Sequence, residues 1–370
     1  MRKFMFIGAA LLLAAACNSG KQYTVKGTIT GDSESLVNGK AYLFNRDREN
    51  PVRDTAEVIN GVFEFKGSLE TSEPYLITIE GIPGMLPLFL ENDRYTITGV
   101  DTAYTESVIK GGKAQTMLSE LNAEVTALAD EYDMNALIIK LRIPTTPQDE
   151  RDSLMAVYEK YQAECDSIKN LYVAKDPVSN LSLYFLDQDF FSLPIDSVEY
   201  LVGEFKLRPE FSANRILARV DSQLQTELSL QPGNPCIDFT MDGPDGKPVT
   251  LSDIYRENKV TMIDFWAGWC GPCRMFNPTL VEIYKEYHSK GFEILGVSLD
   301  RNADDWKNAI KADKLTWPQV SDLKFWESEA AAMYNVRYIP QNVFVDSDGN
   351  ILGRRLGEDE IVSLLEEHLN

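Results

Sequence analysis

Histidine is nearly absent from this 370-residue chain, which contains only His288 and His368. A structural zinc site needs four ligands, commonly two Cys-x-x-Cys pairs or one such pair with histidines. The chain has a single Cys-x-x-Cys pair, and each histidine lies in a helix-like segment without a second ligand nearby. The ligand count therefore disfavours a metal centre, and we expect no cofactor.

Positive charge is also scarce, with 36 Lys and Arg against 57 Asp and Glu, a net charge of -21. Nucleic-acid binding requires a cationic surface, and so does adsorption to anionic lipid. The charge balance excludes nucleic acid as an expected partner. It predicts an acidic surface that is well solvated.

The apolar run after Arg2 and Lys3 is shorter than the ~20 residues of a typical membrane span. With its basic start, the run predicts a secretory signal over residues 1–16. The small residues before Cys17 resemble the lipobox of bacterial lipoproteins, although Ala14 stands where Leu is usual. That resemblance implies lipidation of Cys17, with simple cleavage as the alternative.

Residues 17–22 then form a short tether, "CNSGKQ", without an acidic run after the cysteine. An acidic run there resembles a surface-export signal in some Gram-negative lipoproteins. We therefore expect a cell-envelope protein that faces the periplasm and is anchored in the membrane by lipid on Cys17.

Cysteine is used sparingly, with five residues in the chain. A disulfide-stapled secreted domain carries more cysteines in a shorter sequence. Cys165 belongs to an apolar stripe at helical spacing and is expected to be a buried, inert thiol. Cys236 is also expected to be buried, and a third redox thiol remains the alternative. Cys270 and Cys273 form the Cys-x-x-Cys pair, which is expected to be functional.

The chain before residue 231 divides into two segments by periodicity. Residues 23–111 contain short alternating runs rich in Val, Ile, Thr, Tyr and Phe, separated by Gly and Asn turns, which predicts an all-β, sandwich-like domain or a partly open barrel. Residues 112–230 carry apolar residues three and four apart and are expected to be helical. Ser212 is the expected cap of the last helix in this segment.

A Pro/Gly break, "QPGNP" at 231–235, precedes a third segment in which strands alternate with helices. The pattern ends in a hairpin around Asp348-Gly349 and a final helix. Residues 231–370 are therefore expected to form an α/β domain with a mixed sheet flanked by helices.

The pair lies in "DFWAGWCGPCRMFNP", between a strand-like run and a helix-like run. A disulfide between residues so close in sequence constrains the unfolded chain little, so a structural staple is disfavoured. At the start of a helix, unpaired N–H groups and the helix dipole favour a thiolate. Cys270 is therefore the expected exposed attacking thiol and Cys273 the resolving thiol. Gly271 and Pro272 shape the turn.

The stretch "DFWAGWCGPC" resembles the active site of the thioredoxin superfamily. Flanking motifs over residues 231–370 resemble the membrane-anchored TlpA/ResA-like thiol-disulfide oxidoreductases; they are "PCIDFTMDGPDGKPVTLSD", "GVSLD" and "YNVRYIPQNVFVDSDGNI". The resemblance implies a thioredoxin-like fold. It also implies disulfide exchange with disulfide-containing or dithiol proteins, and a membrane redox donor.

The same resemblance implies roles for single residues. Ile339-Pro340 matches the cis-proline position, which faces the cysteines and helps to hold the substrate chain. Asp264 matches the buried acid that takes a proton from the resolving thiol, and Trp266 and Trp269 match the aromatic residues that flank the site. Trp269 is expected on the docking surface.

Phe276 departs from the TlpA/ResA pattern, because an acid often stands three residues after the second cysteine. Cytochrome-maturation specialists rely on that acid, so this substrate class is not assigned. The β segment has its own resemblance, to an uncharacterised N-terminal domain fused to thioredoxin-like modules in Bacteroides-type envelope proteins.

The leading hypothesis is a lipid-anchored periplasmic thiol-disulfide oxidoreductase. The Gly-Pro linker resembles that of reducing thioredoxins, which favours the reducing direction. Two alternatives are an envelope binding or assembly lipoprotein with an accessory redox module, and a peroxidase that uses one cysteine.

Overall fold

The computed structural model describes residues 22–45 and 53–369. The predicted signal peptide and Cys17, the predicted lipidation site, lie outside these residues. None of the helices in the described ranges is long and apolar enough to span a membrane. The chain forms two compact units, which are described separately: one covers the chain up to Ser192 together with Leu201–Ala218, the other Leu193–Tyr200 and Arg219–Asn370.

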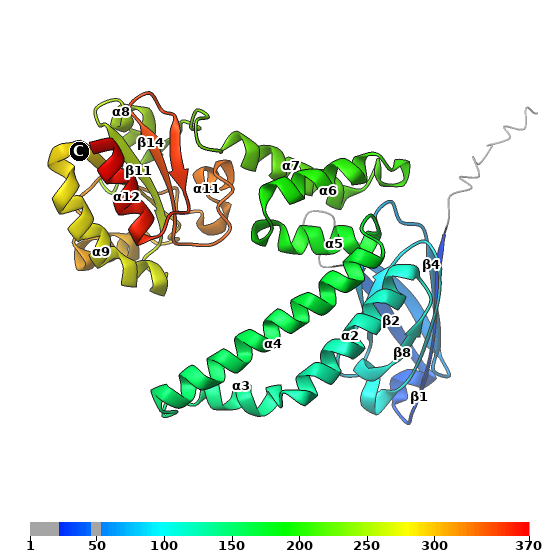
Figure 1. The fold of residues 1–370 in the computed structure, drawn as a ribbon. Helices are drawn as coiled ribbons and strands as arrows, with labels where there is room; N and C mark the ends of the chain where they lie inside the picture. The colour runs from blue at the N-terminus through cyan, green and yellow to red at the C-terminus, as the bar shows by residue number, and fades with distance from the viewer. Residues whose placement is uncertain (1–21, 46–52, 370) are drawn as a thin grey trace, which may run out of the picture. The chain divides into compact units, whose positions relative to one another are not determined.

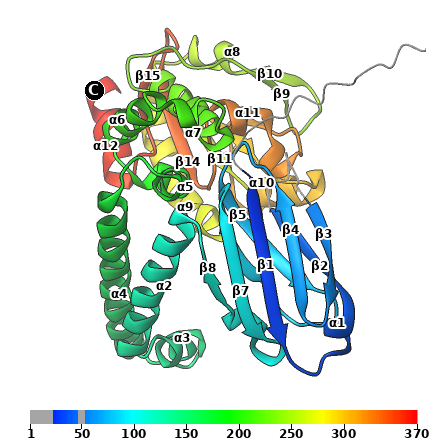
Figure 2. The same cartoon turned by 90° about the vertical axis from the view of Figure 1, so that its right-hand side faces the viewer.

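The first unit is built on one eight-stranded sheet with the order β6-β5-β2-β3-β4-β1-β7-β8. Its strands are β1 (Tyr23–Thr30), β2 (Asn38–Asn45), β3 (Arg53–Ile59), β4 (Val62–Gly67), β5 (Glu73–Ile79), β6 (Leu86–Leu90), β7 (Arg94–Val100) and β8 (Val108–Lys110). Neighbours pair antiparallel, except that β1 and β7 run parallel. Figure 2 shows β8, β7, β1 and β4 in succession across the sheet.

Alternating side chains of these strands meet in a single apolar core, so the sheet curves around its own inner face. Gly27 of β1 makes room for the Phe63 ring of β4, because a Cβ there would lie 2.0 Å from that ring. The β-rich character is confirmed. All eight strands belong to one hydrogen-bonded sheet, which fits the partly open barrel of the two predicted arrangements.

Helices follow the sheet along the chain, as predicted for this segment (Figure 1). They are α1 (Glu34–Val37) between two strands, then α2 (Lys113–Glu131), α3 (Met134–Arg142), α4 (Gln148–Lys175), α5 (Asn180–Asp189), α6 (Ile195–Lys206) and α7 (Arg215–Ser229). Helix α4 packs along α2 and α3. The boundary between the two units falls within α6 and again within α7.

Two sequence expectations for this segment are wrong. Asn214, not Ser212, caps α7: its side-chain oxygen accepts from the backbone N–H groups of Ile216 and Leu217, at 2.9 and 3.1 Å. Ser212 lies outside the helix and its hydroxyl donates to the Pro209 carbonyl. Cys165 is half-buried instead of buried, because α4 packs along only part of its surface and few of its side chains are enclosed.

The second unit contains a five-stranded mixed sheet in the order β13-β12-β11-β14-β15, with a separate hairpin of β9 and β10. The strands are β9 (Thr240–Asp242), β10 (Pro248–Thr250), β11 (Val260–Trp266), β12 (Phe292–Ser298), β13 (Gln319–Val320), β14 (Gln341–Asp346) and β15 (Ile351–Arg354). The helices are α8 (Leu251–Tyr255), α9 (Gly271–Tyr287), α10 (Ala303–Asp313), α11 (Glu329–Met333) and α12 (Glu358–Leu369).

Strand β11 lies at the centre of this sheet, parallel to β12 and antiparallel to β14. All seven of its residues are buried, as expected for a strand covered on both faces. Helices α9 and α12 pack together beside β12 and β11, while α8 contacts both strands as well. The predicted thioredoxin-like arrangement of a mixed sheet flanked by helices is confirmed (Figure 1). The buried central strand ends at Trp266, shortly before Cys270 and the start of α9.

Candidate functional site

The cysteine pair occupies the junction between β11 and α9. Cys270 is the N-cap residue of α9, and Pro272 sits in the first turn, where a missing N–H costs nothing. The backbone N–H of Cys273 donates to the Cys270 sulfur at 3.1 Å. This bond and the dipole of a 17-residue helix stabilise negative charge on the Cys270 sulfur whenever the pair is reduced.

Cys270 and Cys273 form a disulfide, with 5.3 Å between their Cα atoms. Cys270 was expected to be exposed, and in the disulfide form it is only 4% exposed; Cys273 is 1% exposed. The Cys270 sulfur is covered because it lies 3.8 Å from the Ile339 carbonyl oxygen. Cys273 is the more enclosed of the two, which agrees with its expected inner position.

Ile339 and Pro340 lie in the loop that leads into β14, and the peptide bond between them is cis. Both residues are half-buried. Because β14 pairs with β11, the loop before β14 reaches the same end of the sheet at which β11 delivers the cysteines. The structure therefore brings Ile339 next to Cys270, two segments about 70 residues apart in the chain.

Asp264 is buried within β11 at 2% exposure. It lies opposite Gly296 of β12 and Asn342 of β14. Its Oδ2 atom has no hydrogen-bond partner among residues 22–45 and 53–369. Burial disfavours the charged form and raises the pKa of the carboxyl to about 7, so Asp264 can gain or lose a proton near neutral pH.

The two tryptophans of the motif have different environments. Trp266 is fully buried, and its indole N–H donates to Gln319 Oε1 at 3.0 Å. Trp269 is 48% exposed and contacts two further aromatic rings at tilted or edge-on angles, with 5.1 Å to Phe325 and 6.1 Å to Trp326 between ring centroids. An exposed aromatic cluster of this kind suits docking of a polypeptide.

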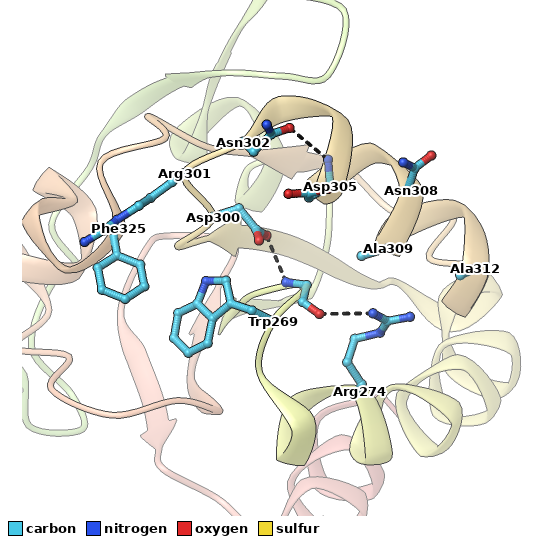
Figure 3. Close-up of a pocket in the computed structure, with 11 residues that line it drawn as sticks. Trp269, Arg274, Asp300, Arg301, Asn302, Asp305, Asn308, Ala309, Ala312 and Phe325 are labelled. Atoms are coloured by element: carbon cyan, nitrogen blue, oxygen red, sulfur yellow. Dashed lines mark hydrogen bonds between the residues drawn. The ribbon is translucent and has the colours of Figure 1, made fainter.

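A cavity of about 470 Å³ adjoins this cluster (Figure 3). Trp269, Phe325 and Arg301 line it, together with residues of α10. The Arg301 guanidinium lies 4.0 Å from the Phe325 ring centroid, a cation–π contact. Sequence reasoning missed Phe325, Trp326 and Arg301; the only signal was the pair of bulky aromatics in "KFWES", outside any periodic pattern.

A polar network that the sequence did not reveal fixes the turn before Cys270. The Gly268 N–H donates to Asp300 Oδ2 at 2.9 Å, and the Gly268 carbonyl accepts from Arg274 at 3.0 Å (Figure 3). Arg274 also forms a bidentate pair with Asp313 of α10. The turn is thus held by the loop after β12 and by Arg274 of α9, which Asp313 fixes in turn, so Cys270 follows a rigid support.

Three other residues singled out by sequence lie outside this arrangement. Phe276 is half-buried on α9 and packs against the core of the unit. Cys236 is half-buried, not buried, because its stretch runs along the surface; burial still raises the pKa of its thiol, which lies beside Tyr334. His288 stacks on Tyr284. The described residues contain no cluster of His, Cys, Asp or Glu suited to a metal ion.

Two families match the chain: residues 232–353 match the AhpC/TSA family, and residues 23–118 match a domain of unknown function, DUF4369. The thiol-disulfide oxidoreductase ResA of a Bacillus cereus strain is 29% identical over 129 residues, 35% of this chain and 72% of that protein. The C-terminal region is a thioredoxin-like thiol-disulfide oxidoreductase domain. The predicted resemblance is confirmed for this domain and for the uncharacterised N-terminal domain.

Further similarity to the thioredoxin-like domain comes from ResA of Oceanobacillus iheyensis, 36% identical over 107 residues, 29% of this chain and 53% of that protein. A solved thiol-disulfide oxidoreductase from Bacteroides fragilis NCTC 9343 is 32% identical and covers 36% of this chain and 98% of its own, with a TM-score of 0.35. We assign the fold from the strand order and the family match.

Proposed function

We propose that this protein exchanges disulfides with protein substrates through Cys270 and Cys273, in the reducing direction, at the periplasmic face of a membrane. Lipid on Cys17 would provide the anchor. The observation that carries the proposal is the placement of Cys270: its sulfur caps α9, accepts the Cys273 N–H and is bonded to the Cys273 sulfur. A second sulfur within bonding reach is what an exchange cycle requires.

The proposed cycle starts from the reduced pair. The Cys270 thiolate attacks one sulfur of a substrate disulfide, which forms a mixed disulfide and expels the other substrate sulfur as a thiolate. Cys273 then loses its proton to the Asp264 carboxylate and attacks the Cys270 sulfur. The Cys270–Cys273 disulfide forms and the second substrate thiolate leaves. The substrate gains two electrons, and a membrane dithiol donor returns the pair to its reduced form.

Several features support the individual roles. The pKa of Asp264, about 7, lets its carboxylate accept a proton near neutral pH. Trp269 offers an exposed aromatic face beside the pair, and the carbonyl oxygen of Ile339, which precedes Pro340, lies 3.8 Å from the Cys270 sulfur. Gly271 and Pro272 form the first turn of α9 without polar side chains that would compete for the sulfur. We assign Trp269, Ile339-Pro340 and this Gly-Pro turn to substrate docking.

The exchange itself is tested by trapping. In the full chain with Cys273→Ser, Cys270 should retain substrates as mixed disulfides that reducing agent releases. The matched control carries Cys270→Ser as well and should trap nothing, whereas Cys236→Ser added to Cys273→Ser should leave the adducts unchanged. If no adduct forms with Cys273→Ser under either oxidising or reducing conditions, the assignment of Cys270 as the attacking thiol is wrong.

The reducing direction is tested by the reduction potential of the pair. The Gly-Pro linker favours a value near that of thioredoxin, about -270 mV. Equilibration of the full chain with glutathione or dithiothreitol buffers measures it. A value close to about -120 mV, at the oxidising end of the known range, would contradict the proposed direction.

A further inference from the structure

Glu227 is a buried carboxylate on the last turns of α7, outside the matched residues 232–353 but inside the same compact unit. It is 4% exposed. Its oxygens accept from three side chains at 2.8 Å each: Arg354, Arg355 and Asn335. A buried carboxylate with this many charged and polar donors fixes the groups that surround it.

The three donors lie at the two ends of one segment, Tyr334–Gln341, or donate hydrogen bonds to these ends. This segment contains Ile339 and Pro340. Asn335 lies at its start, and Arg354 also donates to the Tyr334 carbonyl at 3.2 Å. Arg355 contacts the far end, because its Nε donates to Gln341 Oε1 at 3.4 Å. Both ends of the segment are thus tied to a single carboxylate, and Ile339 between them faces the Cys270 sulfur at 3.8 Å.

The backbone at two of these contacts is unusual. Asn335 has φ +53° and Arg355 has φ +57°, in the left-handed region. Asparagine adopts this region readily, whereas for a long side chain such as Arg355 it is uncommon and depends on the surroundings. Both residues bond to Glu227. The carboxylate therefore helps to hold the uncommon backbone conformation of Arg355, the residue that contacts the far end of the segment.

The charges around Glu227 also indicate that its carboxylate holds the segment ends in place. Arg354 and Arg355 are adjacent in sequence, and Arg354 is almost fully enclosed. Burial lowers the pKa of Arg354, and the Glu227 carboxylate opposes that effect. Without Glu227, two like charges would face each other in a region of restricted solvent. Relief of that repulsion would move the arginines, and with them the segment ends that they hold.

We propose that Glu227 is a positioning residue for substrate exchange: it holds Tyr334–Gln341 in place against Cys270, so α7 determines how well a protein disulfide docks there. This inference rests on the proposed function of the cysteine pair. It gives the end of the helical segment a role in the reaction, although α7 contributes no group to the chemistry.

The test compares a protein disulfide with a small one, using the full chain. For Glu227→Gln we expect the KM for insulin reduction with dithiothreitol to rise on the order of tenfold, with kcat little changed, because docking geometry is lost and the thiol chemistry is not. Single-turnover reaction of the reduced protein with 5,5′-dithiobis(2-nitrobenzoate) should keep its wild-type rate, since this small disulfide does not dock along the segment.

Two further variants separate positioning from loss of structure. Arg355→Gln leaves the Glu227–Arg354 pair intact and should raise the KM in the same direction by a smaller factor. Glu227→Gln combined with Arg355→Gln should raise the KM by less than the product of the single effects, because both act through one contact. Glu367→Gln, on the exposed face of α12, is the charge-matched control and should change neither assay.

An unchanged KM for insulin in Glu227→Gln would overturn the inference, provided that the wild type reduces insulin. An equal loss of rate with both disulfides would overturn it too, because that result indicates general damage to the domain. A wild-type protein that fails to reduce insulin would instead count against the proposed function.

Discussion

Replacement of Asp264 by Asn should remove a pH-dependent loss of stability from the thioredoxin-like domain. Burial raises the pKa of Asp264 from 3.8 to about 7. In the unfolded chain the carboxyl ionises near 3.8, whereas in the folded domain it stays protonated until about pH 7. Between these values the folded state binds more protons, so stability falls as pH rises.

The size of the effect follows from that window. Each pH unit between about 4 and 7 costs the folded domain about 1.4 kcal/mol, and the total above pH 7 is on the order of 4 kcal/mol. The asparagine side chain of the variant would carry no charge at any pH. The variant and the wild type should therefore be similar in stability near pH 4, and the variant should be the more stable one at pH 8.

The assay is denaturant unfolding of the oxidised full chain, followed by tryptophan fluorescence. All five tryptophans lie between Trp266 and Trp326, so the signal reports on the thioredoxin-like domain alone. Asp348→Asn, on the exposed turn between β14 and β15, is the matched control and should keep the wild-type pH dependence. Stability curves of wild type and Asp264→Asn that run parallel from pH 4 to pH 8 would refute the reasoning.

Three other changes have defined outcomes. Trp269→Ala should raise the KM for insulin several-fold without altering the reaction of a small disulfide, because it removes the exposed face of the aromatic cluster; equal effects on both substrates would contradict this. Asn214→Ala should lower the free energy of unfolding of the α7 region by about 1 kcal/mol through loss of its cap, measured by hydrogen exchange, with Ser212→Ala as a neutral control. Cys17→Ser should abolish incorporation of labelled fatty acid in cells and release the protein from membranes; retained label would exclude lipidation at this residue.

Much of the C-terminal domain could be predicted because its local signals agree with its tertiary structure. Strand β11 is a mostly apolar run that contains Asp264, and Pro272 marks the start of α9. The burial of Cys270 could not be predicted, since it arises from Ile339, a residue distant in sequence. Turn patterns alone do not determine which strands pair, so the sequence left a sandwich and a partly open barrel as alternatives for the first unit.

The residues around the site were harder to predict than the cysteines. Gly268 and Asp300, in the loops after β11 and β12, and Arg274 and Asp313, on α9 and α10, act through hydrogen bonds that no local periodicity indicates. Glu227 gave no signal either, because a glutamate within a helical stretch is ordinarily on a solvated face. Only the assembled structure shows that it is enclosed by two arginines.

The most direct test of the central claim is the relative reactivity of the thiols in the reduced full chain. Brief alkylation with iodoacetamide at pH 7, followed by peptide mass spectrometry, measures modification at each cysteine. The α9 terminus and the Cys273 N–H predict that Cys270 reacts first and faster than an ordinary cysteine, with Cys273 and Cys236 far slower. Faster modification of Cys236 or Cys273 than of Cys270 would contradict the account.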